Sequence, residues 1–216
     1  MPGETMMDNT SKLLLRCLND HLEKSKTALS DEITNQGELY TMAKSHDVVG
    51  MVYHQLKGVI GSDKRFVQNY SASIFFYAGR NRCFETVTKA FQENGIRYAV
   101  VKGAAIANLY PISALRTMGD IDLLIREEDK PQIHQIMLDL GYECVGDKTG
   151  QDWQYKNKTI EFELHPLMIY PDEQVEKKEY IRFFNDFWPY VDENGNLKKE
   201  FHTRLPAPNR ENYKLY

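Results

Sequence analysis

The sequence predicts an α/β (α+β) protein in which an N-terminal helical region precedes a small sheet. Through most of residues 1–94, apolar residues recur every three or four positions, as they do on one face of a helix. After Gly95 the pattern changes to short runs in which apolar and charged residues alternate, as in half-buried strands. We therefore expect two domains, a helical region over residues 1–94 and a sheet-containing core over residues 95–216.

Three helices are expected in the first domain, over residues 9–29, 37–57 and 63–93. Gly61 suits the end of the second helix and Gly95 suits the end of the third, because glycine tolerates the left-handed backbone that often closes a helix. The third helix carries a stripe of large side chains that we expect to face the core: Phe66, Tyr70, Ile74, Tyr77, Phe84, Val87 and Phe91.

The second domain is expected to contain both strands and helices. The expected strands cover residues 96–101, 121–125, 142–145, 153–155 and 159–164. The expected helices cover residues 104–109, 129–141 and 180–188. Asn194 and Gly195 indicate a turn near the end of the chain.

Composition excludes several classes of protein. Among 216 residues, 42% are hydrophobic and 27% are charged, which is typical of a globular chain and excludes collagen-like or wholly disordered proteins. No apolar run is long enough to span a membrane and no secretion signal opens the chain, so we expect a cytoplasmic protein without a membrane partner. The net charge of −4 disfavours binding to long duplex nucleic acid. The cysteines, with no CxxC pair, are expected to be buried and unpaired: Cys17, Cys83 and Cys144.

Two carboxylates occupy one face of a predicted strand. In residues 119–125, Asp120 and Asp122 alternate with isoleucine and leucine, so both carboxylates point to the same side of the sheet. Residues two apart in a strand are separated by about 6–7 Å. Two like charges in an apolar strand favour an intervening cation, although a solvated edge strand is the alternative interpretation.

A later strand repeats this design. In residues 159–165, Glu161, Glu163 and His165 share one face and apolar residues share the other. If this strand pairs beside the Asp120 strand, a third carboxylate joins the first two and forms the oxygen-rich site that Mg²⁺ prefers. His165 is expected to be a hydrogen-bond partner rather than a metal ligand, because oxygen ligands suit Mg²⁺ better.

A glycine lies at the junction between a predicted strand and a helix. Lys102 and Gly103 follow the first strand, and Ala104 begins the expected helix. Glycine permits close approach of a ligand to the backbone, but such glycines are commonly structural, and the phosphate-binding P-loop pattern is absent.

Taken together, these residues resemble a known family. They resemble the uncharacterised bacterial nucleotidyltransferases of the DNA polymerase β-like superfamily. The motifs that carry this resemblance are KGAA at 102–105, LYP at 109–111, Arg116, GDIDLL at 119–124, Gly141-Tyr142 and ELH at 163–165. The resemblance covers about residues 96–170. It implies a nucleotidyltransferase-fold core with a small mixed sheet, preceded by the N-terminal helical region.

The resemblance also implies roles for individual residues. Asp120, Asp122 and Glu163 would form the catalytic and metal-binding set, with Glu161 as the alternative third carboxylate. The cofactor is expected to be Mg²⁺, as two ions, with Mn²⁺ as an alternative. The residues that would meet the nucleotide phosphates are Lys102, Gly103, Ala104 and Arg116. Many relatives carry serine where this chain has Ala104, so any phosphate contact there would come from backbone N–H groups.

The expected activity is metal-dependent transfer of a nucleoside monophosphate. The donor would be an NTP, with ATP expected, and the acceptor a hydroxyl group of a small molecule, a protein or an RNA end. One alternative is a catalytically inactive module of the same fold that binds a nucleotide or a protein partner. A metal-dependent phosphohydrolase is a more distant alternative, because such enzymes commonly use several histidine ligands and only His165 lies near these carboxylates.

Overall fold

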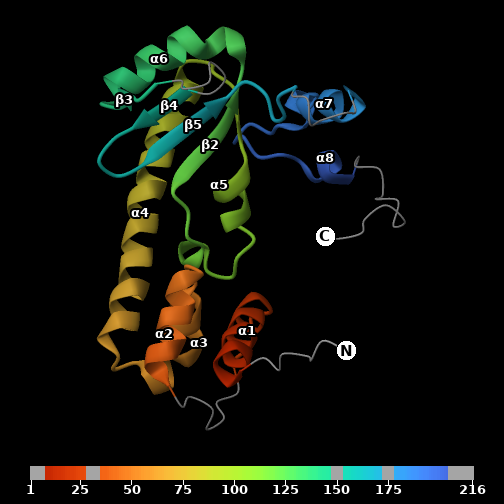
Figure 1. Ribbon diagram of the computed structural model, residues 1–216. Coiled ribbons are helices and arrows are strands. Elements are labelled where there is room, and N and C mark those ends of the chain that lie inside the picture. The colour runs from red at the N-terminus through yellow and green to blue at the C-terminus, as the bar shows by residue number, and fades with distance from the viewer. Residues whose placement is uncertain (1–7, 28–34, 147–152, 172–177, 204–216) are drawn as a thin grey trace. The chain divides into compact units, whose positions relative to one another are not determined.

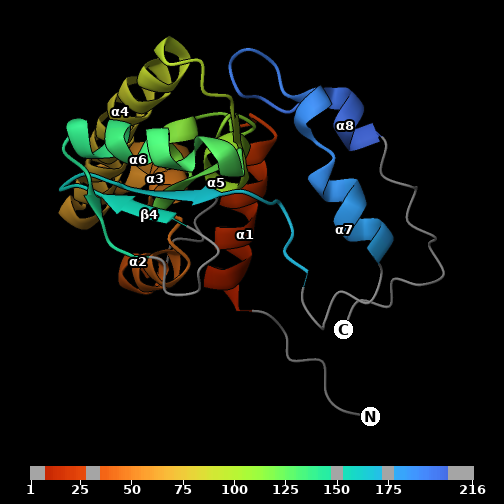
Figure 2. The same cartoon turned by 90° about the horizontal axis from the view of Figure 1, so that it is seen from above.

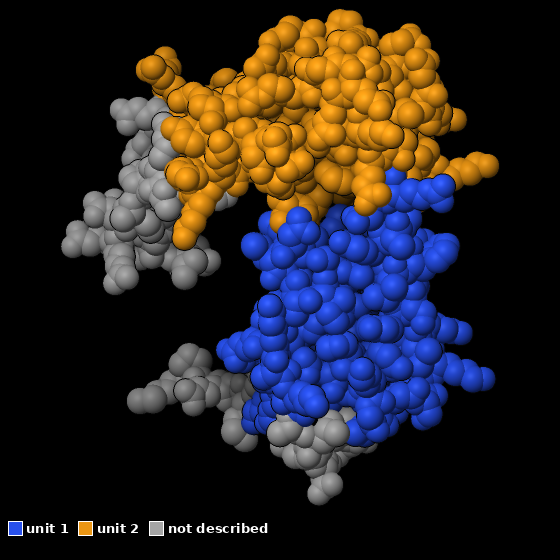
Figure 3. All heavy atoms as spheres, turned by 180° about the vertical axis from the view of Figure 1, so that it is seen from behind, with its two compact units in different colours: residues 1–82, 106–119 blue, residues 83–105, 120–216 orange. Residues whose placement is uncertain are grey.

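Figure 1 shows a computed structural model that describes residues 8–27, 35–146, 153–171 and 178–203. The described chain combines helices with a five-stranded mixed sheet, which confirms the expected fold class. It divides into two compact units (Figure 3). Unit 1 consists of Met1–Arg82 and Ile106–Gly119, and unit 2 consists of Cys83–Ala105 and Asp120–Tyr216. This division places residues 83–94 with the sheet, whereas the domain boundary expected at residue 94 stays a prediction.

Unit 1 is helical. It contains α1 (Asn9–Leu22), α2 (Gln36–Ser45), α3 (Val49–Ile60), the first part of α4 (Lys64–Glu93) and the short η1 (Ser113–Leu115). The first two helices begin at side chains that accept a hydrogen bond from the first turn, as N-cap residues do: Asp8 and Asn35. The core of the unit is built from apolar residues of all four helices: Leu13, Leu14, Cys17, Leu39, Ala43, Val49, Val52, Leu56, Ile60 and Phe66.

Two helix predictions in unit 1 were wrong in detail. The helix expected over residues 37–57 is interrupted after Ser45, because the backbone turns at Asp47, whose φ of 54° is left-handed and incompatible with a continuing helix. The helix expected over residues 9–29 ends at Leu22, and Lys24 follows with a φ of 57°. Residues 28 and 29 lie outside the described part of the chain.

The long helix was predicted correctly, but its aromatic stripe is only partly a core. Helix α4 spans Lys64–Glu93, in agreement with the expected 63–93. Phe66, Val87 and Phe91 near its two ends are fully buried. In its middle, Ile74 is 38% exposed, and Tyr70 and Tyr77 are half-buried. The periodicity was therefore a sound guide to the helix but not to the burial of its central turns.

Unit 2 contains the sheet. Its strands are β1 (Tyr98–Val100), β2 (Asp120–Ile125), β3 (Glu143–Cys144), β4 (Trp153–Lys156) and β5 (Glu161–His165). They lie in the order β1-β2-β5-β4-β3. The pair β2 and β5 is parallel, and the other three pairs are antiparallel. The chain passes from β2 to β5 through α6 (Lys130–Asp139) and the hairpin of β3 and β4.

Helices cover one face of this sheet. The C-terminal part of α4 and helix α6 lie on the same side (Figure 2). Their side chains pack with the apolar face of β2 and β5 into one buried core, which includes Val87, Phe91, Ile121, Leu123, Ile133, Met137, Phe162 and Leu164. Because β-strand side chains alternate between faces, this core leaves the charged residues of β2 and β5 on the opposite face.

The C-terminal segment covers part of that opposite face. It consists of α7 (Lys178–Asn185), η3 (Trp188–Tyr190) and α8 (Lys199–Thr203), so the helix expected over residues 180–188 is shorter and followed by a 3₁₀ turn. Apolar residues of this segment pack on Ala99 and Leu124 of the sheet: Phe187, Val191 and Phe201. The turn expected at Gly195 is present, with a φ of 78° and a backbone oxygen that accepts a hydrogen bond from Val100 N at 2.7 Å.

The cysteines are unpaired thiols, as expected, but they are not all buried. Cys17 is fully buried in unit 1, whereas Cys144 is exposed on the edge strand β3. Burial raises the pKa of the Cys17 thiol to about 11. Within the described ranges, none of the helices combines the length and apolar character needed to span a bilayer.

Candidate active site

The charged residues of β2 and β5 meet because these two strands pair in parallel. In this register Asp120 lies opposite Glu161 and Asp122 lies opposite Glu163. His165 continues the same face of β5. From the sequence we expected a third carboxylate to join the two aspartates only if these strands pair. The structure shows that they do (Figure 1).

Asp122 is the central residue of the cluster. It is only 3% exposed, and its Oδ1 accepts a hydrogen bond from Lys102 Nζ at 2.6 Å. His165 Nε2 lies 2.9 Å from the same oxygen. Because an ionised carboxylate accepts but does not donate, His165 donates a hydrogen bond through Nε2. One oxygen of Asp122 thus receives two donors from different parts of unit 2.

Local backbone geometry positions Lys102. This residue follows β1 directly and begins α5 (Lys102–Ala107), with a φ of 48° that non-glycine residues seldom adopt. Val101 N donates to the backbone oxygen of Asp122 at 3.3 Å, so the chain leaves β1 immediately beside Asp122. The turn thereby brings the ammonium of Lys102 to the carboxylate, while 60% of the lysine side chain remains exposed.

These contacts shift the ionisation of both partners. Burial alone would raise the pKa of Asp122, but the hydrogen bonds from His165 and Lys102 outweigh it and hold its pKa below the ordinary value. Burial alone would lower the pKa of Lys102, but its hydrogen bond and attraction to Asp122 raise its pKa above the ordinary value. At neutral pH the pair is therefore a carboxylate and an ammonium ion.

Glu163 is oriented by a residue that sequence reasoning missed. Gln154 of β4 lies directly opposite Glu163 in the antiparallel register, and its Nε2 donates to Glu163 Oε1 at 3.0 Å. The other carboxylate oxygen, Oε2, lies 3.7 Å from His165 Nε2. Only the register between β4 and β5 identifies Gln154 as the partner of Glu163.

The cluster has the composition of a divalent metal site. Asp122, Glu163 and His165 each offer one ligand atom, and these atoms all lie within 4.8 Å of one another. Two carboxylate oxygens and one imidazole nitrogen suit Mn²⁺ and Zn²⁺, and the carboxylates suit Mg²⁺. The donor set therefore fits a divalent cation. For the ion to bind, the Lys102 ammonium must leave Asp122 Oδ1, and His165 must lose the proton on Nε2.

The structure distributes the other expected residues between the units. Asp120 is half-buried on the same face as Asp122, one row closer to the start of β2. Gly103 and Ala104 lie in the first turn of α5, directly after Lys102. Glu161 lies opposite Asp120 rather than Asp122. Arg116 belongs to unit 1, where it lines a pocket described below.

A mixed sheet with a carboxylate cluster at a parallel strand pair is consistent with a nucleotidyltransferase-like fold. The chain belongs to a family described as uncharacterised nucleotidyltransferases, whose family model matches residues 33–211. This family confirms the nucleotidyltransferase resemblance that the motifs predicted. Searches among curated proteins and among solved structures give no match to this chain.

Proposed function

We propose that this protein is a metal-dependent nucleotidyltransferase that transfers a nucleoside monophosphate, with AMP expected, from an NTP to a hydroxyl acceptor. The observation that carries this proposal is the convergence of Asp122, Glu163 and His165 on two paired strands, in a chain of a nucleotidyltransferase family. Carboxylates held in this way are what a phosphoryl-transfer enzyme needs, because catalysis of that reaction rests mainly on positioning and charge stabilisation.

The reaction forms one bond and breaks one bond at the α-phosphorus of the NTP. The acceptor oxygen bonds to that phosphorus, the bond from the phosphorus to the bridging oxygen of the pyrophosphate breaks, and pyrophosphate leaves with the electron pair. In this proposal Glu163 takes the proton of the acceptor hydroxyl, and Gln154 holds Glu163 in place through its 3.0 Å hydrogen bond.

Asp120, Asp122 and Glu163 would be the carboxylate ligands of the two Mg²⁺ ions. His165, which the sequence led us to expect only as a hydrogen-bond partner, would add a nitrogen ligand beside Asp122 and Glu163. When bound, such an ion stabilises the negative charge that develops on the transferred phosphoryl group. Lys102 would then exchange Asp122 for a phosphate oxygen of the NTP, since its side chain is largely exposed and flexible. Gly103 and Ala104, with backbone N–H groups and little side-chain bulk, would allow the phosphates to approach.

The first test is calorimetric titration of each of the four NTPs into the full chain, with Mg²⁺ or Mn²⁺ and again with EDTA. The wild-type protein is expected to bind at least one NTP in a metal-dependent way. Asp122→Asn is expected to abolish that metal dependence and to reduce transfer by more than about 100-fold, because loss of a ligand exceeds the 10–100-fold cost of losing a supporting residue. Asp139→Asn, an exposed carboxylate on α6, is the matched control.

The second step follows the label of an α-phosphate-labelled NTP into acceptors from three classes: small hydroxyl compounds, proteins and RNA ends. Pyrophosphate release together with labelled acceptor supports the proposal. Release of inorganic phosphate would indicate a phosphohydrolase instead. Equal NTP binding by the wild-type protein and Asp122→Asn, with and without metal, would contradict a metal-dependent site.

One observation favours a second candidate function, a non-catalytic module that binds a nucleotide or a protein partner. Lys102 and His165 already supply Asp122 with two hydrogen bonds, so this carboxylate is neutralised by groups of the chain itself. A site with internal compensation has no energetic need for a cation. NTP binding without turnover against every acceptor class, unchanged in EDTA, is the result that this alternative predicts.

A further inference from the structure

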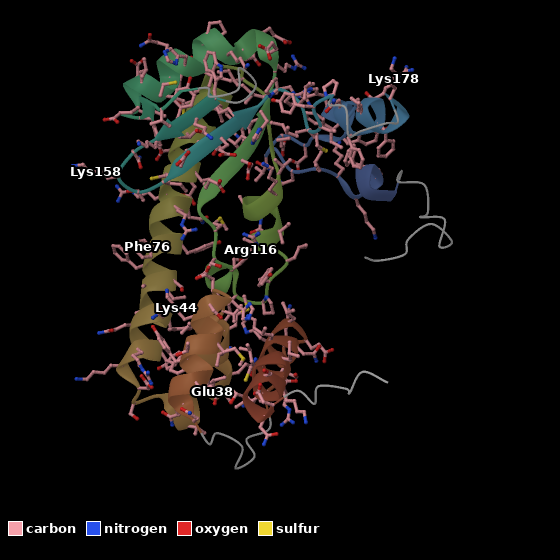
Figure 4. The ribbon with its side chains drawn as sticks, viewed as in Figure 1. Glu38, Lys44, Phe76, Arg116, Lys158 and Lys178 are labelled. Atoms are coloured by element: carbon pink, nitrogen blue, oxygen red, sulfur yellow. The ribbon has the colours of Figure 1, made fainter. Side chains whose placement is uncertain are left out.

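Unit 1 contains a pocket that includes none of the residues of the carboxylate cluster in unit 2. It is formed by α2, the start of α3, α4 and the segment around η1, and it has a volume of about 180 Å³. Its lining includes three basic side chains, Lys44, Arg80 and Arg116, against a single carboxylate, Asp47. Figure 4 labels Lys44 and Arg116, which reach this region of unit 1 from different elements.

The three basic groups have neutral partners instead of carboxylates. Lys44 Nζ lies 3.5 Å from Asn69 Oδ1, Arg80 donates to the backbone oxygen of Met118, and Arg116 donates to the backbone oxygen of Thr117 at 3.2 Å. In the ranges that the structure describes, none of the three forms an ion pair.

Among the three basic residues, Arg80 gives the strongest reason to expect an anionic ligand. It is half-buried on α4, and burial lowers the pKa of its guanidinium. Removing a cation from water without an opposite charge costs free energy, so buried cations are normally paired. A carbonyl oxygen offers only part of that compensation. An anionic ligand in the pocket would supply the missing charge.

The volume of the pocket and the residues that line it indicate what kind of ligand it can hold. Pockets for drug-sized molecules hold roughly 300–1,000 Å³, so a volume of about 180 Å³ fits a charged group rather than a whole nucleotide. Arginine presents several N–H donors in a fixed plane that matches the oxygens of a phosphate. Phe76, which is 54% exposed, lines the same pocket and offers an apolar contact to the organic part of a phosphorylated ligand.

We propose that this pocket of unit 1 binds the phosphate group of a phosphorylated ligand, with Lys44, Arg80 and Arg116 as its cationic partners. Ser73 and Thr117 also line the pocket, but their hydroxyls already donate to the backbone oxygens of Asn69 and Asp47, at 3.0 and 3.4 Å, so the basic groups carry the proposal. The ligand is either the NTP itself or a second phosphorylated molecule, such as an acceptor. The site belongs to unit 1 alone and does not require the carboxylates of unit 2.

The test is calorimetric titration of inorganic pyrophosphate into the full chain in EDTA, where the metal-dependent site of unit 2 does not contribute. The wild-type protein is expected to bind one pyrophosphate. Arg80→Gln/Arg116→Gln is expected to weaken binding by at least about tenfold, because it removes the charge-assisted hydrogen bonds that the two guanidinium groups would donate to the phosphates. The control Lys12→Gln/Lys64→Gln removes two exposed charges elsewhere in unit 1 and should leave the affinity within about twofold at equal ionic strength.

A second variant keeps the test decisive if the arginine variant does not fold. Ala72→Glu adds a carboxylate to the α4 wall of the pocket, where it can pair with the basic groups, and is expected to abolish pyrophosphate binding while the helix content by circular dichroism stays unchanged. No pyrophosphate binding by the wild type would overturn the proposal. So would equal binding by the wild type and a folded Ala72→Glu.

Competition with ATP in EDTA separates the two sources of phosphate. If ATP displaces pyrophosphate and the arginine variant loses both ligands, the pocket holds the phosphates of the donor. If pyrophosphate binds and ATP does not compete, the pocket serves another phosphorylated molecule. Both results support a phosphate site in unit 1, and neither depends on the Asp122→Asn result, so the two proposals fail independently.

Discussion

The two candidate sites compensate their charges in opposite ways. In unit 2, Asp122 receives hydrogen bonds from Lys102 and His165, so its charge is balanced by the chain itself. In unit 1, Lys44, Arg80 and Arg116 hydrogen-bond to amide and carbonyl oxygens, and among the described residues they form no ion pair. The comparison indicates two different grounds for proposing a site: an excess of like charge in unit 1 and a cluster of potential metal ligands in unit 2.

Because of this difference, the two sites would bind their ligands in different ways. A cation entering the unit 2 cluster must displace the Lys102 ammonium and the proton on His165, so its binding is a replacement. An anion entering the unit 1 pocket meets cations without carboxylate partners, so its binding is an addition. Substitutions in each unit test whether these two regions are as different as their contacts indicate.

The largest effect is expected from the packing beneath the unit 2 cluster. Leu123 is fully buried on the apolar face of β2, next to Asp122 in the chain. Leu123→Ala should lower the free energy of unfolding by about 2–5 kcal/mol, because it removes buried apolar surface and leaves a cavity. Urea denaturation measures this change.

The matched control for Leu123 is Leu138→Ala on the exposed side of α6, where Leu138 is 42% exposed. This substitution should change stability by no more than about 0.5 kcal/mol. Equal losses in the two variants would mean that the charged cluster does not depend on the core that positions β2.

An intermediate effect is expected at Gln154. Gln154→Leu removes the donor to Glu163 Oε1 and frees the carboxylate to rotate. Under the proposed function, transfer should fall by about 10–100-fold, as for other residues that orient a metal ligand or a catalytic base. Steady-state kinetics with the acceptor identified by labelling measures the change.

Gln135→Leu on α6 is the control for Gln154, since Gln135 also donates to a carboxylate, Asp139 Oδ1, at 2.8 Å but far along the chain from the cluster. It should leave transfer unchanged. If Gln154→Leu retains full activity, Glu163 needs no support from β4, and its role as the proton acceptor loses its structural basis.

The smallest effect is expected in the core of unit 1, where two histidines pack edge to face with ring centroids 5.4 Å apart. Among the described residues, neither nitrogen of His21 nor Nδ1 of His54 has a hydrogen-bond partner. Burial lowers the pKa of His21, and the nearby His54 lowers it further. Burial likewise lowers the pKa of His54, with a smaller contribution from Lys57.

Both histidines are thus neutral in the folded state at a pH where the unfolded chain already binds protons. Stability contributed by the pair is present above the unfolded pKa of about 6.5 and declines as the pH falls below it. Thermal unfolding between pH 7.5 and 5 should show this decline, and His21→Phe/His54→Phe should flatten it. An equally steep decline in the double variant would assign the pH dependence to other groups.

Much of the fold was predictable because periodicity is a local property of the chain. Alternation in residues 119–125 and 159–165 correctly predicted β2 and β5 and the face on which Asp122 and Glu163 lie. Spacing of apolar residues predicted α4 and α6 within a few residues. The break near Asp47 was not predicted, because apolar spacing continues across it and no glycine marks the left-handed backbone at this position.

The site was only partly predictable because contacts between strands depend on register. The sequence pointed to the carboxylates, but it had no signal for the ion pair between Lys102 and Asp122, and the role of Lys102 at the nucleotide stays a prediction. It also had no signal for Gln154, since a glutamine in a strand is unremarkable until its neighbour is known. Arg80 lies 38 residues from Met118, and no local pattern connects the two.

The parallel pairing of β2 with β5 has a consequence for how the molecule is made. Asp122 and His165 are separated by 43 positions, and the intervening chain must complete α6 and a hairpin before the two strands can meet. Contacts of such long range form slowly, because closing the chain costs entropy before the pairing repays it. During synthesis the cluster stays incomplete until residue 165 has left the ribosome, so a truncated or half-folded product carries Asp122 without the partners that complete its site.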